Sequence, residues 1–150
     1  MISSIAGRAS VLPLNGWYHA SKFGLEALSD VLRVEVASFG VAVSIVEPGF
    51  FKTGITGRSR EAASVHAAHE HSPYARAYER MDTLINLAER FAPPAAVVAW
   101  TIVSAAESRS PLRRYVVGLD ALATIAAEAL APRALTDFAM RLAANLMSKG

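Results

Sequence analysis

The chain has 150 residues and a formal net charge of +2, with 53% hydrophobic and 19% charged residues. This balance is typical of a globular domain with one hydrophobic core, and it excludes an intrinsically disordered chain. No apolar run approaches the ~18 residues of a membrane span, the basic residues form no stripe typical of nucleic-acid binding, and cysteine is absent. The composition favours a cytoplasmic protein without a nucleic-acid partner.

The first predicted elements are a strand end and a long helix. Residues 1–4 are typical of the end of a strand that runs into a loop. Residues 17–39 predict a helix, and Gly40 follows where a left-handed cap is usual. Apolar residues form two neighbouring stripes on this helix. The remaining polar positions are predicted to face solvent: Glu26, Asp30 and Arg33.

The rest of the chain alternates strands with helices. Residues 41–46 are β-rich, end at Glu47-Pro48-Gly49, and predict a strand buried on both faces, as in a parallel sheet. Residues 114–118 predict a second short strand. Further helices are predicted over residues 74–90, 93–108, 121–130 and 133–147. This alternation predicts an α/β fold.

Tyr18 and Lys22 are the first candidates for chemistry. They lie four residues apart at the start of the long predicted helix, so their side chains project from one face. A tyrosine hydroxyl has an ordinary pKa of about 10, and a nearby ammonium lowers that pKa by favouring the phenolate. The pair is therefore a sensible proton-transfer site. Taken alone the pattern is weak, since most such pairs are a half-buried tyrosine beside a solvated lysine.

Three ordered motifs resemble signatures of the short-chain dehydrogenase/reductase family. They are Ser3-Ser4-Ile5-Ala6-Gly7, Tyr18-His19-Ala20-Ser21-Lys22 and Val46-Glu47-Pro48-Gly49. Residues 115–121 resemble that family's last strand and its exit. The resemblance implies that residues 1–150 form a single partial domain, the C-terminal part of a Rossmann-type doubly wound parallel sheet with flanking helices. Residues 50–90 would be its substrate-binding lid.

The resemblance implies catalytic roles for three residues. Tyr18 would be the general acid in carbonyl reduction, or the general base in alcohol oxidation. Lys22 would lower the pKa of Tyr18 and bind the nicotinamide ribose, and Ser4 would hydrogen-bond the substrate oxygen. The loop from Ser4 to Tyr18 is about one residue longer than expected, which leaves the choice between Ser3 and Ser4 open. Ser4 could also serve only to satisfy backbone groups at a strand end.

The resemblance also implies a cofactor site for NAD or NADP. Tyr18 and Lys22 would contribute to it, Pro48 and Gly49 would place backbone against the nicotinamide ring, and the Thr53 hydroxyl would bind the carboxamide or a phosphate oxygen. Pro48-Gly49 is also a good turn anywhere, and Thr53 could be a helix N-cap without a ligand. The family's Gly-rich phosphate-binding turn is missing from the sequence. The chain is therefore expected to be a catalytic half that is inactive when isolated, with its cofactor choice unreadable.

Two functions from different classes remain open. The first is an NAD(P)-dependent oxidoreductase that interconverts a carbonyl and an alcohol by hydride transfer on a hydrophobic small molecule. The alternative is a truncated non-enzymatic remnant that acts at most as an oligomerisation or interaction module. Small residues on the 17–39 helix predict a homo-oligomer through that helix: Ala20, Gly24, Ala27 and Val31.

Histidines elsewhere give weaker signals. His66, His69 and His71 near Glu70 do not share one helical face, so a solvated loop is a better interpretation than a metal site. Beside Tyr18, His19 has two open interpretations, substrate contact and plain packing.

Overall fold

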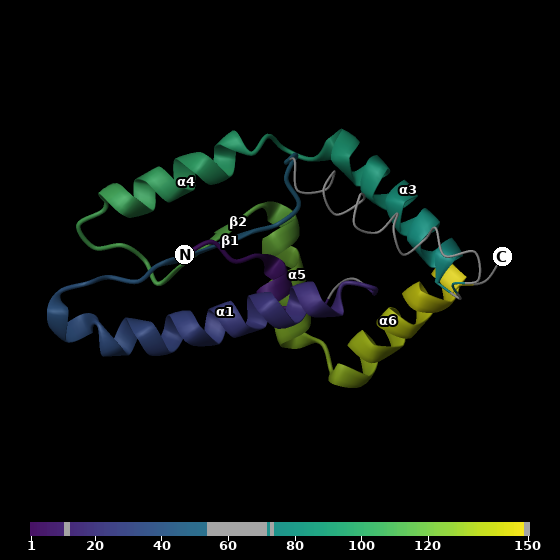
Figure 1. Ribbon diagram of the computed structural model, residues 1–150, viewed down its shortest axis with the longest axis horizontal. Helices are drawn as coiled ribbons and strands as arrows, with labels where there is room; N and C mark the ends of the chain where they lie inside the picture. Colours follow the sequence, from purple (N-terminus) through teal and green to yellow (C-terminus); the bar gives the residue numbers. More distant parts are fainter. Residues whose placement is uncertain (11–12, 54–71, 73, 149–150) are drawn as a thin grey trace. The chain divides into compact units, whose positions relative to one another are not determined.

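The computed structural model describes residues 1–10, 13–53, 72 and 74–148 (Figure 1). Its elements are η1 (Ile5–Gly7), α1 (Gly16–Glu35), η2 (Ala37–Phe39), β1 (Ile45–Pro48), α3 (Ala75–Phe91), α4 (Ala96–Glu107), β2 (Arg114–Val117), α5 (Leu119–Leu130) and α6 (Arg133–Ser148). They form two compact units. The first contains Met1–Phe50 and Ala95–Ala131, and the second contains Phe51–Pro94 and Pro132–Gly150.

A small parallel sheet lies at the centre of the first unit. β1 and β2 pair in parallel from Ile45↔Arg114 to Pro48↔Val117. The chain's first residues extend this sheet, because the Ser3 amide donates to the Val46 carbonyl at 2.8 Å and the Val46 amide donates to the Met1 carbonyl at 2.9 Å. These bonds confirm the predicted strand end at residues 1–4. They also confirm the α/β class with a parallel sheet.

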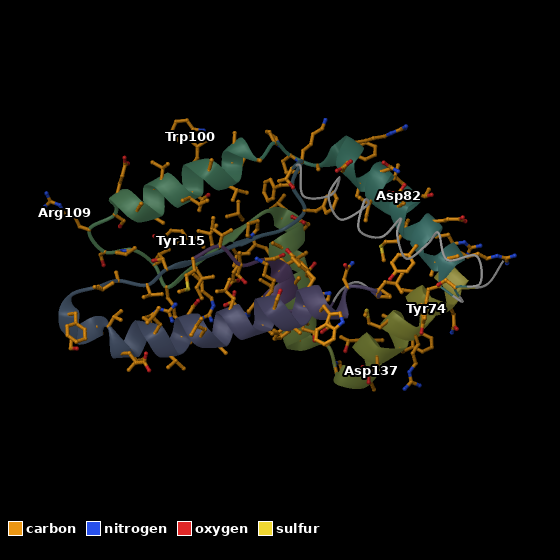
Figure 2. All side chains as sticks on the ribbon, in the orientation of Figure 1. Tyr74, Asp82, Trp100, Arg109, Tyr115 and Asp137 are labelled. Carbon is orange, nitrogen blue, oxygen red and sulfur yellow. The ribbon has the colours of Figure 1, made fainter. Side chains whose placement is uncertain are left out.

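Helices cover both faces of the strands in this unit. α1 and α4 lie on opposite sides of β1 and β2 (Figure 1). Their apolar core is small, and Ile45 and Ala121 are fully buried in it. Many larger apolar side chains on the outer faces remain exposed, such as Trp100, which projects from α4 away from the strands (Figure 2).

The predicted helix over residues 17–39 is shorter in the structure. α1 ends at Glu35, and a 3₁₀ turn over Ala37–Phe39 follows. Gly40 closes that turn with φ of 72°, which confirms the predicted left-handed cap. The helix therefore tightens over its last residues before the cap.

The predicted strand over residues 41–46 is wrong at its start. β1 begins only at Ile45, whose amide donates to the Arg113 carbonyl at 3.1 Å. Before that point the segment does not pair with β2, although the Met1 amine of the first strand donates to the Ser44 carbonyl at 2.7 Å. Arg33 Nε donates to the Val43 carbonyl at 2.8 Å, and the Ser44 hydroxyl donates to the Leu112 carbonyl at 2.8 Å. The partner strand β2 starts at Arg114, so no ladder forms earlier.

The other predicted helices match α3, α4, α5 and α6 to within three residues at each end. In the second unit α3 packs against α6, and the Arg80 guanidinium donates to the Leu146 carbonyl. Residues 54–71 and 73 of the predicted lid lie outside the described residues. The single-domain assignment stays a prediction. No helix in the described part of the chain has the length and apolar character that crossing a membrane requires.

Candidate active site

Tyr18 and Lys22 lie one turn apart near the start of α1. The Lys22 ammonium lies over the Tyr18 ring, with Nζ 5.7 Å from the ring centroid. Tyr18 is 41% exposed, so a ligand can reach its hydroxyl-bearing ring. The structure thus brings together the two residues that the sequence paired.

Lys22 also ties α1 to the start of the chain. Its Nζ donates to the Ile2 carbonyl at 3.2 Å, immediately before the two serines. An ammonium carries three donors, and this bond uses one of them. Lys22 can therefore hold the first strand and still donate to a bound group.

Ser3 and Ser4 have different surroundings. Ser3 is 4% exposed, and its buried hydroxyl has no hydrogen-bond partner among the described residues. Ser4 is half-buried, with extended backbone, and its Oγ accepts from the Ala6 amide at 3.2 Å, which caps η1. Successive side chains of an extended segment point to opposite faces, so only one of these serines can serve a given site.

His19 connects α1 to η1. Its side chain is buried, and Nδ1 lies 2.9 Å from the Ala6 carbonyl. A carbonyl can only accept, so Nδ1 carries the proton in this bond. The ring meets the Tyr18 ring edge-on, with centroids 6.4 Å apart. These contacts favour the packing interpretation of His19 and fix the turn after Ser4 beside Tyr18.

Pro48 and Gly49 lie at the carboxyl end of β1. The Gly49 amide donates to the Val117 carbonyl at 2.8 Å, and the Phe50 amide donates to Asp120 Oδ2 at 2.6 Å. Because Ile2 pairs in parallel with Val46, Ser4 and this turn leave neighbouring strands at the same edge of the sheet. Ligands of open α/β sheets bind outside the carboxyl ends of the strands.

Thr53 is the remaining predicted site residue. It belongs to the second unit, where its side chain is exposed, while the other predicted site residues lie in the first unit. Its predicted contact with a cofactor stays a prediction.

A buried ionic cluster lies under the same strands. Arg114 Nε is 2.8 Å from Glu47 Oε1, and Glu47 is fully buried. The Arg114 guanidinium also contacts Glu26 at 3.1 Å and Asp30 at 2.9 Å. Arg8 approaches Glu47 at 3.5 Å. The cluster fastens α1 to both strands.

This cluster corrects the prediction that Glu26, Asp30 and Arg33 face solvent. Glu26 is buried, and Arg33 donates to Asp30 at 2.6 Å and to the Val43 carbonyl. The polar side of α1 therefore faces the sheet. A sequence signal existed, since Arg114 begins one predicted strand and Glu47 directly follows the other, and an unpaired charge beside a buried strand is costly.

The carboxylates of this cluster respond to it in opposite ways. Burial raises the pKa of Glu47, and the negative charge of Glu26 raises it further, against the opposing effect of Arg8 and Arg114. Hydrogen bonds from Arg33, Arg113 and Arg114 hold the pKa of Asp30 far below its ordinary value. The arginines thus favour the anionic form of Asp30, whereas burial disfavours the anionic form of Glu47.

No group of metal-binding side chains occurs in the part of the chain that the structure describes. The histidines of the sequence analysis, His66, His69 and His71, lie outside that part, as does Glu70.

Comparison with known proteins identifies several relatives. A family model described as "short chain dehydrogenase" matches residues 1–64. Human short-chain dehydrogenase/reductase family 9C member 7 is 37% identical over 145 residues, which cover 91% of this chain and 46% of that protein. Human 17-beta-hydroxysteroid dehydrogenase type 6 is 33% identical over 147 residues, which cover 91% of this chain and 45% of that protein. The chain spans about half the length of the curated relatives it matches.

A solved structure has a similar fold. A short-chain dehydrogenase from Streptomyces avermitilis superposes with a TM-score of 0.63 at 26% sequence identity, over 97% of this chain and 50% of that one. The similarity agrees with a Rossmann-type sheet and flanking helices.

Proposed function

Because the chain belongs to the short-chain dehydrogenase/reductase family, we propose that it forms the catalytic half of an NAD(P)-dependent oxidoreductase that interconverts an alcohol and a carbonyl. The observation that carries this proposal is the Tyr18–Lys22 pair beside the carboxyl ends of the first strand and β1. Proton-transfer groups at such an edge lie where α/β folds bind their ligands.

In carbonyl reduction, Tyr18 donates its hydroxyl proton to the substrate oxygen while the carbonyl carbon accepts a hydride. In alcohol oxidation both transfers run in reverse. NAD(P), when bound, supplies or accepts the hydride. The Ser4 hydroxyl donates a hydrogen bond to the same oxygen, keeps its proton and orients the substrate. A hydroxyl can do this while accepting from the Ala6 amide, because it has one donor and two acceptor lone pairs.

The cofactor site would use Lys22, Pro48 and Gly49 of the first unit, together with Thr53. Lys22 has donors left for a ribose hydroxyl after its bond to the Ile2 carbonyl. Pro48 and Gly49 would present backbone to the nicotinamide ring, and Thr53 would add a hydroxyl. The 150 residues include no Gly-rich phosphate-binding turn, so we expect them alone to bind NADH only weakly, with a Kd toward the millimolar range.

The substrate would be a hydrophobic alcohol or ketone. One relative is named for a hydroxysteroid, and the predicted lid carries aromatic residues at Phe50, Phe51, Tyr74 and Tyr78, which could equally serve packing. Two of its described residues have exposed apolar surface that an apolar molecule could contact. Tyr74 directly precedes α3, and Leu84 lies on that helix.

The central test is Tyr18→Phe in the full enzyme, meaning the protein expressed from the longest reading frame that contains these residues. Loss of a general acid lowers kcat by about 100-fold or more. The cofactor Kd should change little, because the ring still packs as before. Tyr115→Phe is the matched control, since Tyr115 lies in β2 and should keep turnover within about threefold. A Tyr18→Phe variant with more than a tenth of wild-type kcat, or a full enzyme without turnover, contradicts the proposal.

The full enzyme should also self-associate through α1. The stripe of small residues is exposed, and Val31 and Val34 beside it are 56% and 77% exposed. Ala27→Arg would place a charge in that contact and should yield monomers in sedimentation. Ser38→Arg adds the same charge outside the stripe and should leave assembly unchanged. An unaltered assembly in Ala27→Arg places the interface elsewhere.

A further inference from the structure

Asp120 bridges two segments at the end of the sheet. It lies in the first turn of α5, and Gly118 immediately before that helix has φ of 110°, a conformation suited to glycine. The Asp120 carboxylate accepts the Phe50 amide proton at 2.6 Å, across 70 residues of sequence. A charge-assisted bond of this length is among the stronger kinds of hydrogen bond.

Gly49 lies directly under the same carboxylate. A Cβ built on Gly49 would overlap both carboxyl oxygens and Cγ of Asp120. The backbone of Gly49 does not have a positive φ, so its dihedral angles alone do not demand glycine. Close approach of Asp120 is therefore the reason that only glycine fits this position.

A second bond fixes the same turn from the strand side. The Gly49 amide donates to the Val117 carbonyl at 2.8 Å, so consecutive amides at 49 and 50 are held by β2 and by α5. An acidic residue in a first helical turn is also stabilised by the helix dipole. That effect needs no particular orientation of the side chain and does not explain the contact with Gly49 and Phe50.

We infer that Asp120 is a positioning residue for the cofactor, because it holds the Pro48–Gly49 backbone at the place where the nicotinamide ring binds. This inference rests on the proposed function, which assigns that turn to the cofactor site. Asp120 acts through the turn and does not touch the reacting atoms. Its removal should loosen the turn and weaken cofactor binding more than it slows the chemical step.

The experiment compares Asp120→Ala with Asp120→Asn in the full enzyme. Asparagine keeps an oxygen that can accept the Phe50 amide proton, whereas alanine removes it. We expect Asp120→Ala to raise the cofactor KM by about tenfold with kcat changed less than threefold, and Asp120→Asn to restore KM to within about threefold of wild type. Glu128→Ala, an exposed acidic position on the same helix, should leave both constants unchanged.

A second measurement does not depend on activity. In the 150-residue chain, hydrogen exchange of the Phe50 amide should become about tenfold faster in Asp120→Ala and stay near the wild-type rate in Asp120→Asn. Equal exchange rates in all three proteins would overturn the assigned bond. If Asp120→Asn behaves like Asp120→Ala in KM, or if Asp120→Ala has a wild-type KM, the positioning role is wrong.

A double-mutant cycle with Gly49→Ala sharpens the test. The added methyl group meets the Asp120 carboxylate, so Gly49→Ala alone should raise the cofactor KM, and adding Asp120→Ala should cause no further rise. Independent, additive effects would contradict the contact. Failure here is distinguishable from failure of the proposed function. If Tyr18→Phe abolishes turnover while Asp120→Ala has a wild-type KM, the function stands and this inference falls, whereas an active Tyr18→Phe enzyme refutes the function itself.

Discussion

Two groups of polar side chains share the sheet-facing side of α1. Near its start, Tyr18 is partly exposed and Lys22 spends one donor on the Ile2 carbonyl. One to two turns further along, Glu26 and Asp30 contact arginines that come from β2 and from the helix itself. The first group retains donors that the fold does not occupy. The carboxylates of the second group are paired with arginines, apart from the buried Glu26 Oε1, which has no hydrogen-bond partner among the described residues.

This difference distinguishes a candidate catalytic site, Tyr18 and Lys22, from a structural ionic cluster, Glu26 and Asp30 with their arginines. A proton-transfer group must exchange partners during a reaction, so it needs donors or acceptors that the fold does not occupy. A buried carboxylate that only fixes a helix is most stable when every oxygen is paired. α1 carries both the candidate site and the ionic cluster. The edge of the sheet, where ligands bind, lies near the start of α1, whereas the strands lie beside its middle.

The largest expected effect is a loss of stability when the ionic cluster is disrupted. Arg114→Met leaves Glu26 and Glu47 as buried carboxylates that have lost their principal cation, which should lower the free energy of unfolding by about 3–5 kcal/mol. Urea unfolding of the full enzyme measures it. Arg109→Met is the matched control, because Arg109 projects from the loop after α4 (Figure 2) and should change stability by less than about 0.5 kcal/mol.

Adding Glu47→Gln to Arg114→Met should recover part of the lost stability, since it removes one of the unpaired buried charges. A loss below about 1 kcal/mol in Arg114→Met would mean that water or neighbouring groups already neutralise this cluster.

The sequence predicted the Tyr18–Lys22 pair but not the ionic cluster around Arg114. Tyr18 and Lys22 are neighbours in the sequence, so helical spacing was enough to place them on one face. Glu26 and Arg114 are 88 residues apart, and no local pattern indicates that they meet. The apolar stripes of α1 misled the assignment of its solvent side, because periodicity reveals faces without revealing which face meets the sheet.

The turn at Pro48–Gly49 was also only half predictable. Its motif and its place after a strand are visible in the sequence, and β1 ends there as expected. The contact of Asp120 with Phe50 depends on how α5 begins after β2, which a residue pattern does not specify. The late start of β1 has the same cause, because the length of the partner strand β2 decides where a ladder can form.

The next prediction concerns Lys22 of the candidate catalytic pair. Lys22→Ala should lower kcat by about 10- to 100-fold and also weaken cofactor binding, because the ammonium serves Tyr18 and the ribose together. Its bond to the Ile2 carbonyl is exposed, so the free energy of unfolding should fall by only about 1 kcal/mol. An unchanged cofactor Kd would remove the ribose role. A stability loss as large as that of Arg114→Met would erase the distinction between the two groups.

The smallest expected effect is on how the free energy of unfolding depends on pH when Asp30 of the ionic cluster is replaced. Asp30 accepts from three arginines, which hold its pKa in the folded protein far below the value of about 3.9 in an unfolded chain. A group with a depressed folded pKa stabilises the protein above its unfolded pKa, and this contribution is lost as pH falls toward the folded pKa. Asp30→Asn should therefore lower the free energy of unfolding at pH 7, by about 1 kcal/mol because the side chain is partly exposed.

The deficit of Asp30→Asn should stay constant from pH 7 to about pH 5 and should shrink as pH falls below about 4, where the unfolded aspartate takes up a proton before the folded one does. Urea unfolding at several pH values measures this difference. Asp137→Asn, an exposed position on α6 (Figure 2), should show no deficit at neutral pH. A deficit that persists unchanged down to pH 3 would arise from packing or hydrogen bonding of the amide rather than from the charge. In that case Asp30 would stabilise α1 through packing and hydrogen-bond geometry rather than through its charge. The contrast between Asp30, whose charge is paired with arginines, and Lys22, which has donors left, would then not explain the stability of α1.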